Sequence, residues 1–313
     1  MEDENINAFL NEFMRLLEQM PIEGLILDVR GNGGGYIIAA EFLLQLLTHR
    51  HIEAEPTQFI ATPGTLDLTK KVNGMKAWHK SLKQAVSTGA MYSTGIPLSP
   101  EEVVNQVGQL YFGPVVLITD AYCYSACDMF AAGFQDHEIG PILGVDETTG
   151  AGGANVLTHD ALRASWTGGP LEPLPEGARM RVSLRRTLRV GKRAGEPVED
   201  LGVTRDHAHE MTRDDLLKGN VDLLNAAGKL LSKGTPRKFA VDVKSAGQKL
   251  GLKLSTKNIE AIDVYVDGRP VFESTAISDG TSDIDIDKPS SGSLVEIDGI
   301  DKGEIVAARK HLI

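Results

Sequence analysis

The sequence has few cysteines, few aromatic residues and no long apolar run, and each shortage excludes a class of protein. Two cysteines, Cys123 and Cys127, cannot build the disulfide framework of a small secreted domain, and we expect them to be buried packing residues or free thiols. The longest apolar runs, such as VVLIT at 115–119, are far shorter than the roughly 20 residues that a membrane-spanning helix needs. The N-terminus is acidic where a secretory signal is basic, so the sequence predicts no membrane segment and leaves the location unknown.

Acidic residues outnumber basic ones by 43 to 32, and the formal net charge of -11 repels phosphate backbones. We therefore expect no nucleic acid partner. A hydrophobic content of 42% with 24% charged residues is typical of an ordinary globular protein and excludes disordered and collagen-like classes. At 313 residues the chain has room for roughly two domains of about 150 residues each.

The N-terminal part of the chain predicts an alternation of helices and strands. Apolar residues spaced three and four apart predict an amphipathic helix over about the first sixteen residues, ended by Pro21. The run GLILDV at 24–29 predicts a strand buried on both faces, followed by a glycine-rich turn and a helix. The strand PVVLITD, the helix SACDMFAAGFQDH and the strand PILGVD repeat this alternation, which indicates a mostly parallel sheet with crossover helices.

Other regions differ in composition. Prolines interrupt a polar stretch at about 49–110, which we interpret as a lid or insertion. The arginines of RMRVSLRRTLRV at 179–190 are interpreted as the solvated face of a strand or hairpin arm. After the linker GTPRK at 234–238, short β-type runs between Gly, Pro and Asp-Gly turns predict a small all-β domain. The predicted organisation is an α/β core over 1–233 and a β-rich domain over 234–313.

The glycine-rich turn DVRGNGGG at 28–35 lies between an expected strand and an expected helix. Backbone N–H groups in such a turn can point together and bind an anion at the helix N-terminus. A dinucleotide fingerprint needs Gly or Ala where this chain has Tyr36, and a phosphate-binding loop needs a Lys-Ser/Thr pair that is missing. An oxyanion hole and a merely tight turn remain as alternatives.

Ser125 follows a buried strand at the expected start of a helix, where it can be a nucleophile or simply the helix N-cap. The G-x-S-x-G pattern of other serine hydrolases is missing, because Tyr124 and Ala126 flank it. Cys127 is an alternative nucleophile, but it points roughly 200° around the helix, which favours a packing role. His137 lies about 18 Å along that helix, too far to take a proton from Ser125, and we expect it at the surface or at the helix C-terminus.

Two sequence elements carry a resemblance to a known family. LILDVRGNGGG resembles the LDLRGNPGG element of the S41 peptidases, the tail-specific or C-terminal processing protease family, and YSACDMFAAGFQDH resembles that family's SASEIFAGALQD element. The two elements stand in the family's order, roughly 90 residues apart, and GVDETTGAGGANV follows them. The similarity extends over about residues 1–232. It implies a crotonase/ClpP-like superhelical α/β core with a parallel sheet, and hydrolysis of peptide bonds.

Carried over position by position, the resemblance implies that Ser125 is the nucleophile. It implies that the oxyanion donors are the N–H groups of Ala126 and of one of Gly34 or Gly35. Asp136 matches the aspartate of the family's QD pair and is expected to be structural or to support the catalytic residues from behind them.

The sequence differs from the processing proteases at the position of the general base. Their lysine base falls on Gly150 here, and the chain has no lysine between Lys83 and Lys192, so we do not expect a Ser–Lys dyad. The glycine-rich loop TTGAGGANV at 148–156 and the segment PVEDLGV are closer to the tricorn-type branch, in which a histidine from an earlier part of the chain is the base and a glutamate supports it. Glu199 matches that glutamate. His159 is the candidate base within this chain.

The resemblance carries further expectations. Family members have an N-terminal segment, often a helical part and a PDZ domain, before the point where this chain starts, so we expect the general base outside this chain and consider a fragment or truncated gene product. The family is commonly extracytoplasmic or periplasmic. We expect peptide or protein substrates, consider a homo-oligomer, and expect no cofactor and no metal, since SDGTSDIDIDK lacks the glutamate of a calcium loop. The alternative is a catalytically inactive binding module of the same fold.

Overall fold

The computed structural model describes residues 2–153 and 156–313. Its helices are α1 (Glu2–Leu17), α2 (Ile37–Gln45), α3 (Pro63–Lys71), η1 (Asn73–Trp78), α4 (His79–Thr88), α5 (Glu101–Val104), α6 (Ala126–Asp136), α7 (His159–Ser165), η2 (Pro175–Gly177), η3 (Gly191–Arg193), α8 (Arg213–Leu217) and α9 (Val221–Leu231). The strands before the C-terminal region are β1 (Leu25–Asp28), β2 (Pro56–Phe59), β3 (Ile96–Pro97), β4 (Val115–Thr119), β5 (Ile142–Gly144), β6 (Val156–Thr158), β7 (Arg181–Ser183), β8 (Arg185–Thr187) and β9 (His207–Ala208).

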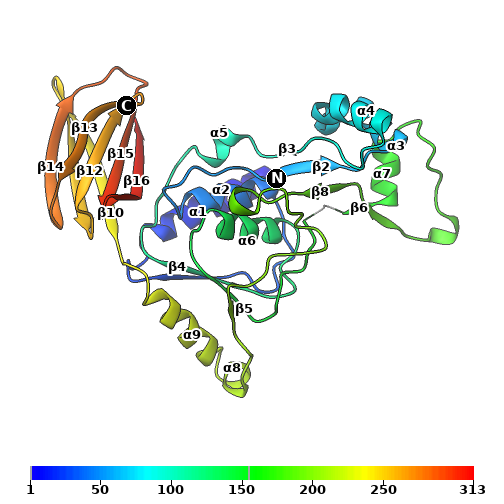
Figure 1. Cartoon of the computed structure of the whole chain (residues 1–313), viewed down its shortest axis with the longest axis horizontal. Coiled ribbons are helices and arrows are strands. Elements are labelled where there is room, and N and C mark those ends of the chain that lie inside the picture. The colour runs from blue at the N-terminus through cyan, green and yellow to red at the C-terminus, as the bar shows by residue number, and fades with distance from the viewer. Residues whose placement is uncertain (1, 154–155) are drawn as a thin grey trace.

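A parallel sheet in the order β1-β4-β5-β9 forms the centre of the molecule (Figure 1). Val115 and Leu117 of β4 pack with α2 and α6 on one face, and Val116 and Ile118 pack with α9 on the other. This two-sided burial explains the continuous apolar run of β4. The expectation of two-sided burial was wrong for β1, which is only partly buried because it lies at the edge of the sheet.

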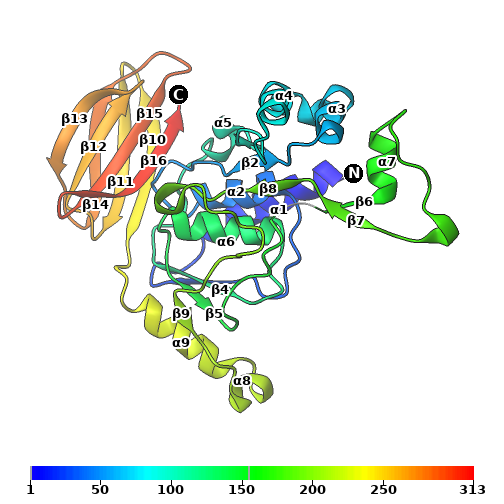
Figure 2. The same cartoon turned by 45° about the vertical axis from the view of Figure 1, so that its right-hand side comes forward.

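A second apolar cluster lies beside this core. The antiparallel sheet β3-β2-β8 and the antiparallel strand pair β6-β7 carry α3, α4 and α7 around Phe59, Trp78 and Leu162. Figures 1 and 2 both show these helices grouped at the end of the molecule opposite the C-terminal strands. The cluster thus combines the segment expected as a lid with residues after 156, and the limits of the lid and of the two domains stay a prediction.

The C-terminal region is a sandwich of two antiparallel sheets, β10-β11-β14 and β13-β12-β15-β16. Alternate residues of strands such as β11 and β15 are buried, as the period of two requires, and Phe239, Leu252 and Ile297 are completely buried. Gln109 of the core accepts a hydrogen bond from the N–H of Ala308. The strands of the sandwich are β10 (Lys238–Ala246), β11 (Lys249–Lys257), β12 (Ala261–Val266), β13 (Arg269–Ala276), β14 (Gly280–Asp287), β15 (Leu294–Asp301) and β16 (Glu304–Leu312).

The fold class expected from the sequence is therefore confirmed as an α/β core with a parallel sheet and a small all-β C-terminal part. Among the described residues, no helix is long and apolar enough to cross a membrane.

The solvated interpretation of the arginines at 179–190 was wrong for Arg189. Its side chain is 4% exposed, and its Nη2 lies 2.6 Å from the Oδ1 of Asp136, whose side chain is completely buried. Its Nη2 also donates to the carbonyl oxygen of Ala132 in α6. Arg189 lies two residues after the end of β8, so this ion pair fixes the end of α6 to the segment after that strand.

Candidate active site

The parallel pairing of β1 with β4 brings together two turns that are about 90 residues apart. Both strands end at the same edge of the sheet, and the glycine-rich turn and the turn before α6 leave from there. The carboxylate of Asp120 accepts the N–H of Gly31 at 3.0 Å from either oxygen, and the N–H of Tyr124 donates to the carbonyl oxygen of Asn32 at 3.0 Å. Three hydrogen bonds therefore hold the two turns against each other.

Ser125 occupies a backbone conformation that residues with a side chain rarely adopt. Its φ is 58° and its ψ is -120°, directly before the first residue of α6. Such conformations cost of order 1–3 kcal/mol and persist only where the surrounding structure enforces them. Ser125 occupies the N-cap position of α6, as the alternative expected, but its side chain makes no capping hydrogen bond.

Gly34 is the residue that meets Ser125. A Cβ atom placed on Gly34 would lie 2.7 Å from the Cβ of Ser125 and 2.9 Å from the backbone nitrogen of Ala126. The φ of Gly34 is +94°, which also favours glycine. The glycine-rich turn therefore needs a residue without a side chain at this position for two separate reasons.

The backbone N–H groups around Ser125 differ in whether they already donate. The N–H of Gly34 donates to the Oδ1 of Asn32 at 2.9 Å. In the described part of the chain, the N–H groups of Gly35 and Ala126 donate no hydrogen bond. Gly35, which follows Gly34, and Ala126, which follows Ser125, therefore each have a free N–H group.

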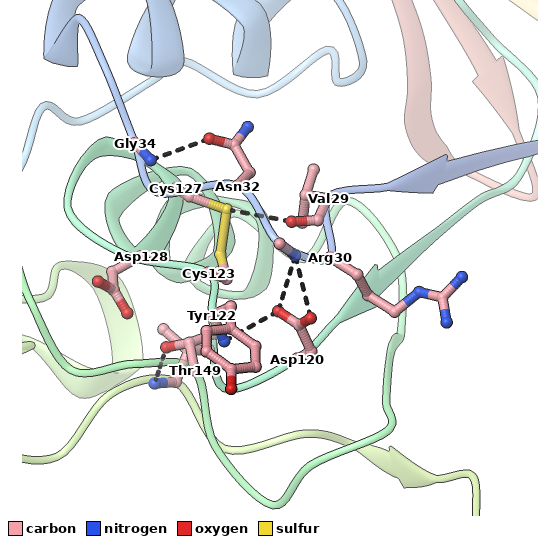
Figure 3. The surroundings of a disulfide bond; sticks show 12 residues. Val29, Arg30, Asn32, Gly34, Asp120, Tyr122, Cys123, Cys127, Asp128 and Thr149 are labelled. Atoms are coloured by element: carbon pink, nitrogen blue, oxygen red, sulfur yellow. Dashed lines mark hydrogen bonds between the residues drawn. A yellow bond between two sulfur atoms is a disulfide. The ribbon is translucent and has the colours of Figure 1, made fainter. Parts of the chain in front are cut away.

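The two cysteines are joined, which corrects the expectation of free thiols, while both are buried as expected. The structure forms a disulfide between Cys123 and Cys127, whose Cα atoms are 5.3 Å apart (Figure 3). Cys123 lies in the turn before α6 rather than in the helix, and its side chain can therefore reach the first helical turn. The disulfide bridges the segment that contains Ser125.

Asp128, which the motifs did not single out, fixes a third segment near Ser125. Its side chain is completely buried and accepts the N–H groups of Ala151 and Gly152 at 3.1 and 3.0 Å. Burial raises the pKa of the Asp128 carboxyl. The pattern S-x-x-D, typical of a capping box, is the sequence signal that points to this residue. The remainder of the glycine-rich loop, Ala154 and Asn155, lies outside the described residues.

Glu199 lies against Gly153 of this loop. Its Oε2 accepts the N–H of Thr187 at 2.7 Å, whereas its Oε1 is buried without a hydrogen-bond partner in the described part of the chain. A Cβ on Gly153 would lie 3.2 Å from Oε1. Burial raises the pKa of Glu199 to about 7. A carboxyl group that titrates near neutral pH and has one free oxygen is suited to hold a basic partner.

The structure does not join the histidine candidates to Ser125. His159 begins α7 and is 5% exposed, and Figures 1 and 2 show α7 beside α3 and α4 rather than beside α6. His137, expected at the surface or at a helix end, caps the end of α6 but is buried, and its Nε2 accepts the N–H of Glu53. Within residues 2–153 and 156–313, the Oγ of Ser125 makes no hydrogen bond with any side chain, and no group of residues suited to a metal ion is found.

A cavity of about 540 Å³ opens beside the free N–H donors. Its walls come from α1, α2, the glycine-rich turn and the start of α6, and they include Phe9, Phe13, Ala39 and Phe130. The walls are mostly apolar, so the cavity is suited to an apolar group.

The chain belongs to peptidase family S41, whose family model matches residues 1–160. Among solved structures, mature CPAF is 20% identical with a TM-score of 0.53, and the match covers 72% of this chain and 46% of that chain. Mature CPAF complexed with lactacystin is 18% identical with a TM-score of 0.52, over 72% of this chain and 47% of that chain. The photosystem II D1 C-terminal processing protease is 18% identical with a TM-score of 0.40, over 73% and 44%.

The chain therefore spans about half the length of these solved structures. At such identities the likeness to CPAF shows the fold, and it agrees with the α/β core expected from the two sequence elements. No curated protein sequence matches the chain.

Proposed function

We propose that the chain is the core of a serine peptidase, in which the Oγ of Ser125 attacks the carbonyl carbon of a peptide bond. The observation that carries this proposal is the conformation of Ser125, strained at φ 58° against Gly34, with a hydroxyl that caps no helix. A strained turn from a strand into a helix exposes a nucleophile and places it at the positive end of the helix dipole.

The free N–H groups of Gly35 and Ala126 are the proposed oxyanion donors. Attack by Ser125 breaks the carbonyl π bond and places a negative charge on the oxygen, which these donors stabilise more strongly than the neutral carbonyl. The N–H of Gly34 is already bound to Asn32, which supports Gly35 as the donor from the glycine-rich turn. Collapse of the intermediate gives an acyl-enzyme and releases the amine.

Glu199 is the proposed acid that orients the base, through its free Oε1. The base takes the proton of Ser125 and gives it to the leaving amine. We propose that a histidine from outside this chain supplies it, because none of the described basic side chains bonds to the Oγ of Ser125. His159 is the candidate within the chain, and it requires α7 to approach α6.

The 540 Å³ cavity is the proposed site for an apolar side chain of the substrate, because it borders both oxyanion donors. An acyl group held by Gly35 and Ala126 would place its substituent beside Phe130. Ala39→Phe reduces the cavity without changing the donors. We expect this variant to react several-fold more slowly with an octyl fluorophosphonate and unchanged with a methyl one, measured by intact mass.

The nucleophile is tested with a fluorophosphonate probe, which forms a covalent bond to an activated serine. We expect one label per chain on Ser125, none on Ser125→Ala, and normal labelling of Ser87→Ala, in which an exposed serine is changed. A label that persists in Ser125→Ala would refute the role of this residue.

One observation favours a second candidate, a binding module that retains the fold without the chemistry. In the described residues no basic side chain bonds to Ser125, and without a base the hydroxyl is a weak nucleophile. This function predicts no probe label on the chain, while apolar peptides still bind and protect the cavity in amide hydrogen exchange.

A further inference from the structure

The turn that carries Ser125 is closed by a covalent bond. Cys123 and Cys127 stand two residues before and two residues after Ser125, and they are the only cysteines of the sequence. Both are buried, at 0% and 5% exposure. The cross-link therefore encloses a ring of five residues with Ser125 at its centre.

The two ends of this ring are attached to different parts of the molecule. The carbonyl oxygen of Cys123 accepts the N–H of Gly150 at 2.8 Å, so the first end is fixed to the glycine-rich loop. Cys127 is the second residue of α6, so the other end moves with the helix. The disulfide sets the distance between loop and helix, and the chain between them must pass through Ser125.

Without the cross-link, Ser125 has an alternative conformation that uses up its hydroxyl. Serine is favoured at a helix N-cap, where its φ is negative and its Oγ accepts the N–H of the second or third helical residue. Here those residues are Cys127 and Asp128. Relaxation to this N-cap would remove the positive φ and occupy the oxygen that attacks the substrate.

We propose that the Cys123–Cys127 disulfide is a positioning clamp that holds Ser125 away from the N-cap conformation, and that a dithiol reductant releases it. The reductant's two thiols become a disulfide, and the protein disulfide becomes two thiols, with two electrons and two protons transferred. Cys127 lines the 540 Å³ cavity, which gives a small dithiol a path to the bond. The effect on reactivity rests on the proposed role of Ser125.

Three measurements on the full chain test the clamp. Alkylation under denaturing conditions, without reductant, counts free thiols by mass, and we expect none. The rate of fluorophosphonate labelling of Ser125 is compared before and after treatment with dithiothreitol, and we expect a loss of about tenfold or more. Amide hydrogen exchange over residues 121–130, followed by mass spectrometry, should increase on reduction.

The double variant Cys123→Ala/Cys127→Ala is the matched control. It should label as slowly as the reduced protein and should not respond to dithiothreitol, because the chain has no other cysteine. Reduction of the natural protein keeps both side chains, so it separates the loss of the bond from the loss of packing atoms.

Two free thiols in the untreated protein would overturn the proposal. An unchanged labelling rate in a chain whose Ser125 reacts would overturn it as well, whatever the exchange shows. If Ser125 is unreactive in both states while reduction still increases the exchange of 121–130, the clamp is supported and the proposed peptidase role fails.

Discussion

Replacing Glu199 by glutamine should stabilise the protein at alkaline pH while it removes a group proposed for catalysis. Glutamine keeps the size of the side chain and an oxygen for the N–H of Thr187, which Glu199 accepts at 2.7 Å. It removes the charge that burial disfavours. The variant therefore separates the effect of ionisation from the effect of packing.

The magnitude follows from the pKa. Burial raises the pKa of Glu199 from 4.5 to about 7, so between these values the folded state binds more protons than the unfolded state. The stability that the protonated Glu199 carboxyl contributes is then fully present below pH 4.5 and is lost as the pH rises through 7. The shift of 2.5 units corresponds to about 3 kcal/mol at most, and solvent screening at this half-buried position reduces it to roughly 1–3 kcal/mol.

The assay is urea unfolding of the natural protein and of Glu199→Gln from pH 5 to pH 8, followed by far-UV circular dichroism. We expect the free energy of unfolding of the variant to gain roughly 1–3 kcal/mol on the natural protein over this range. Glu196→Gln, an exposed change on the same segment, should show no such trend. A difference between Glu199→Gln and the natural protein that is constant with pH would refute the burial argument.

Two further predictions concern residues that fix the site. Gly34→Ala should abolish probe labelling of Ser125, because the new methyl group would lie 2.7 Å from the Cβ of Ser125, whereas Gly35→Ala, which has open space, should retain it. Arg189→Met should lower the free energy of urea unfolding by about 3 kcal/mol, since it removes the 2.6 Å partner of the buried Asp136 carboxylate and leaves only Arg193 at 3.7 Å, and a loss below about 1 kcal/mol would contradict this.

Local sequence patterns were sufficient to predict the helices and strands that surround the site. The apolar run of β4 and the glycines after β1 are signals within a few residues, and parallel strands place their following turns at one edge. The nearness of the turn at 28–35 to Ser125 therefore follows from the sequence once the sheet is parallel. The roles proposed for these residues stay predictions.

The cysteine pair shows where local reasoning failed. Treating the segment as helical from Ser125 onward placed Cys127 on the far side of the helix and gave Cys123 no partner. Cys123 precedes α6, where helical geometry does not apply, and the hydrogen bond between its carbonyl oxygen and Gly150 holds it in the turn. That position depends on a contact between segments more than twenty residues apart, which no spacing rule contains.

Gly150 and Gly152, in the loop at 148–156, are likewise required by a contact with a distant segment. A Cβ on Gly150 or on Gly152 would lie 2.1 Å from the ring of Tyr124, so both positions need glycine for packing rather than for binding an anion. Tyr124 in turn donates its N–H to Asn32 of the glycine-rich turn and immediately precedes Ser125. One aromatic residue thus joins three distant segments around Ser125, and this junction adds to the proposed Cys123–Cys127 clamp in holding the strained φ of Ser125.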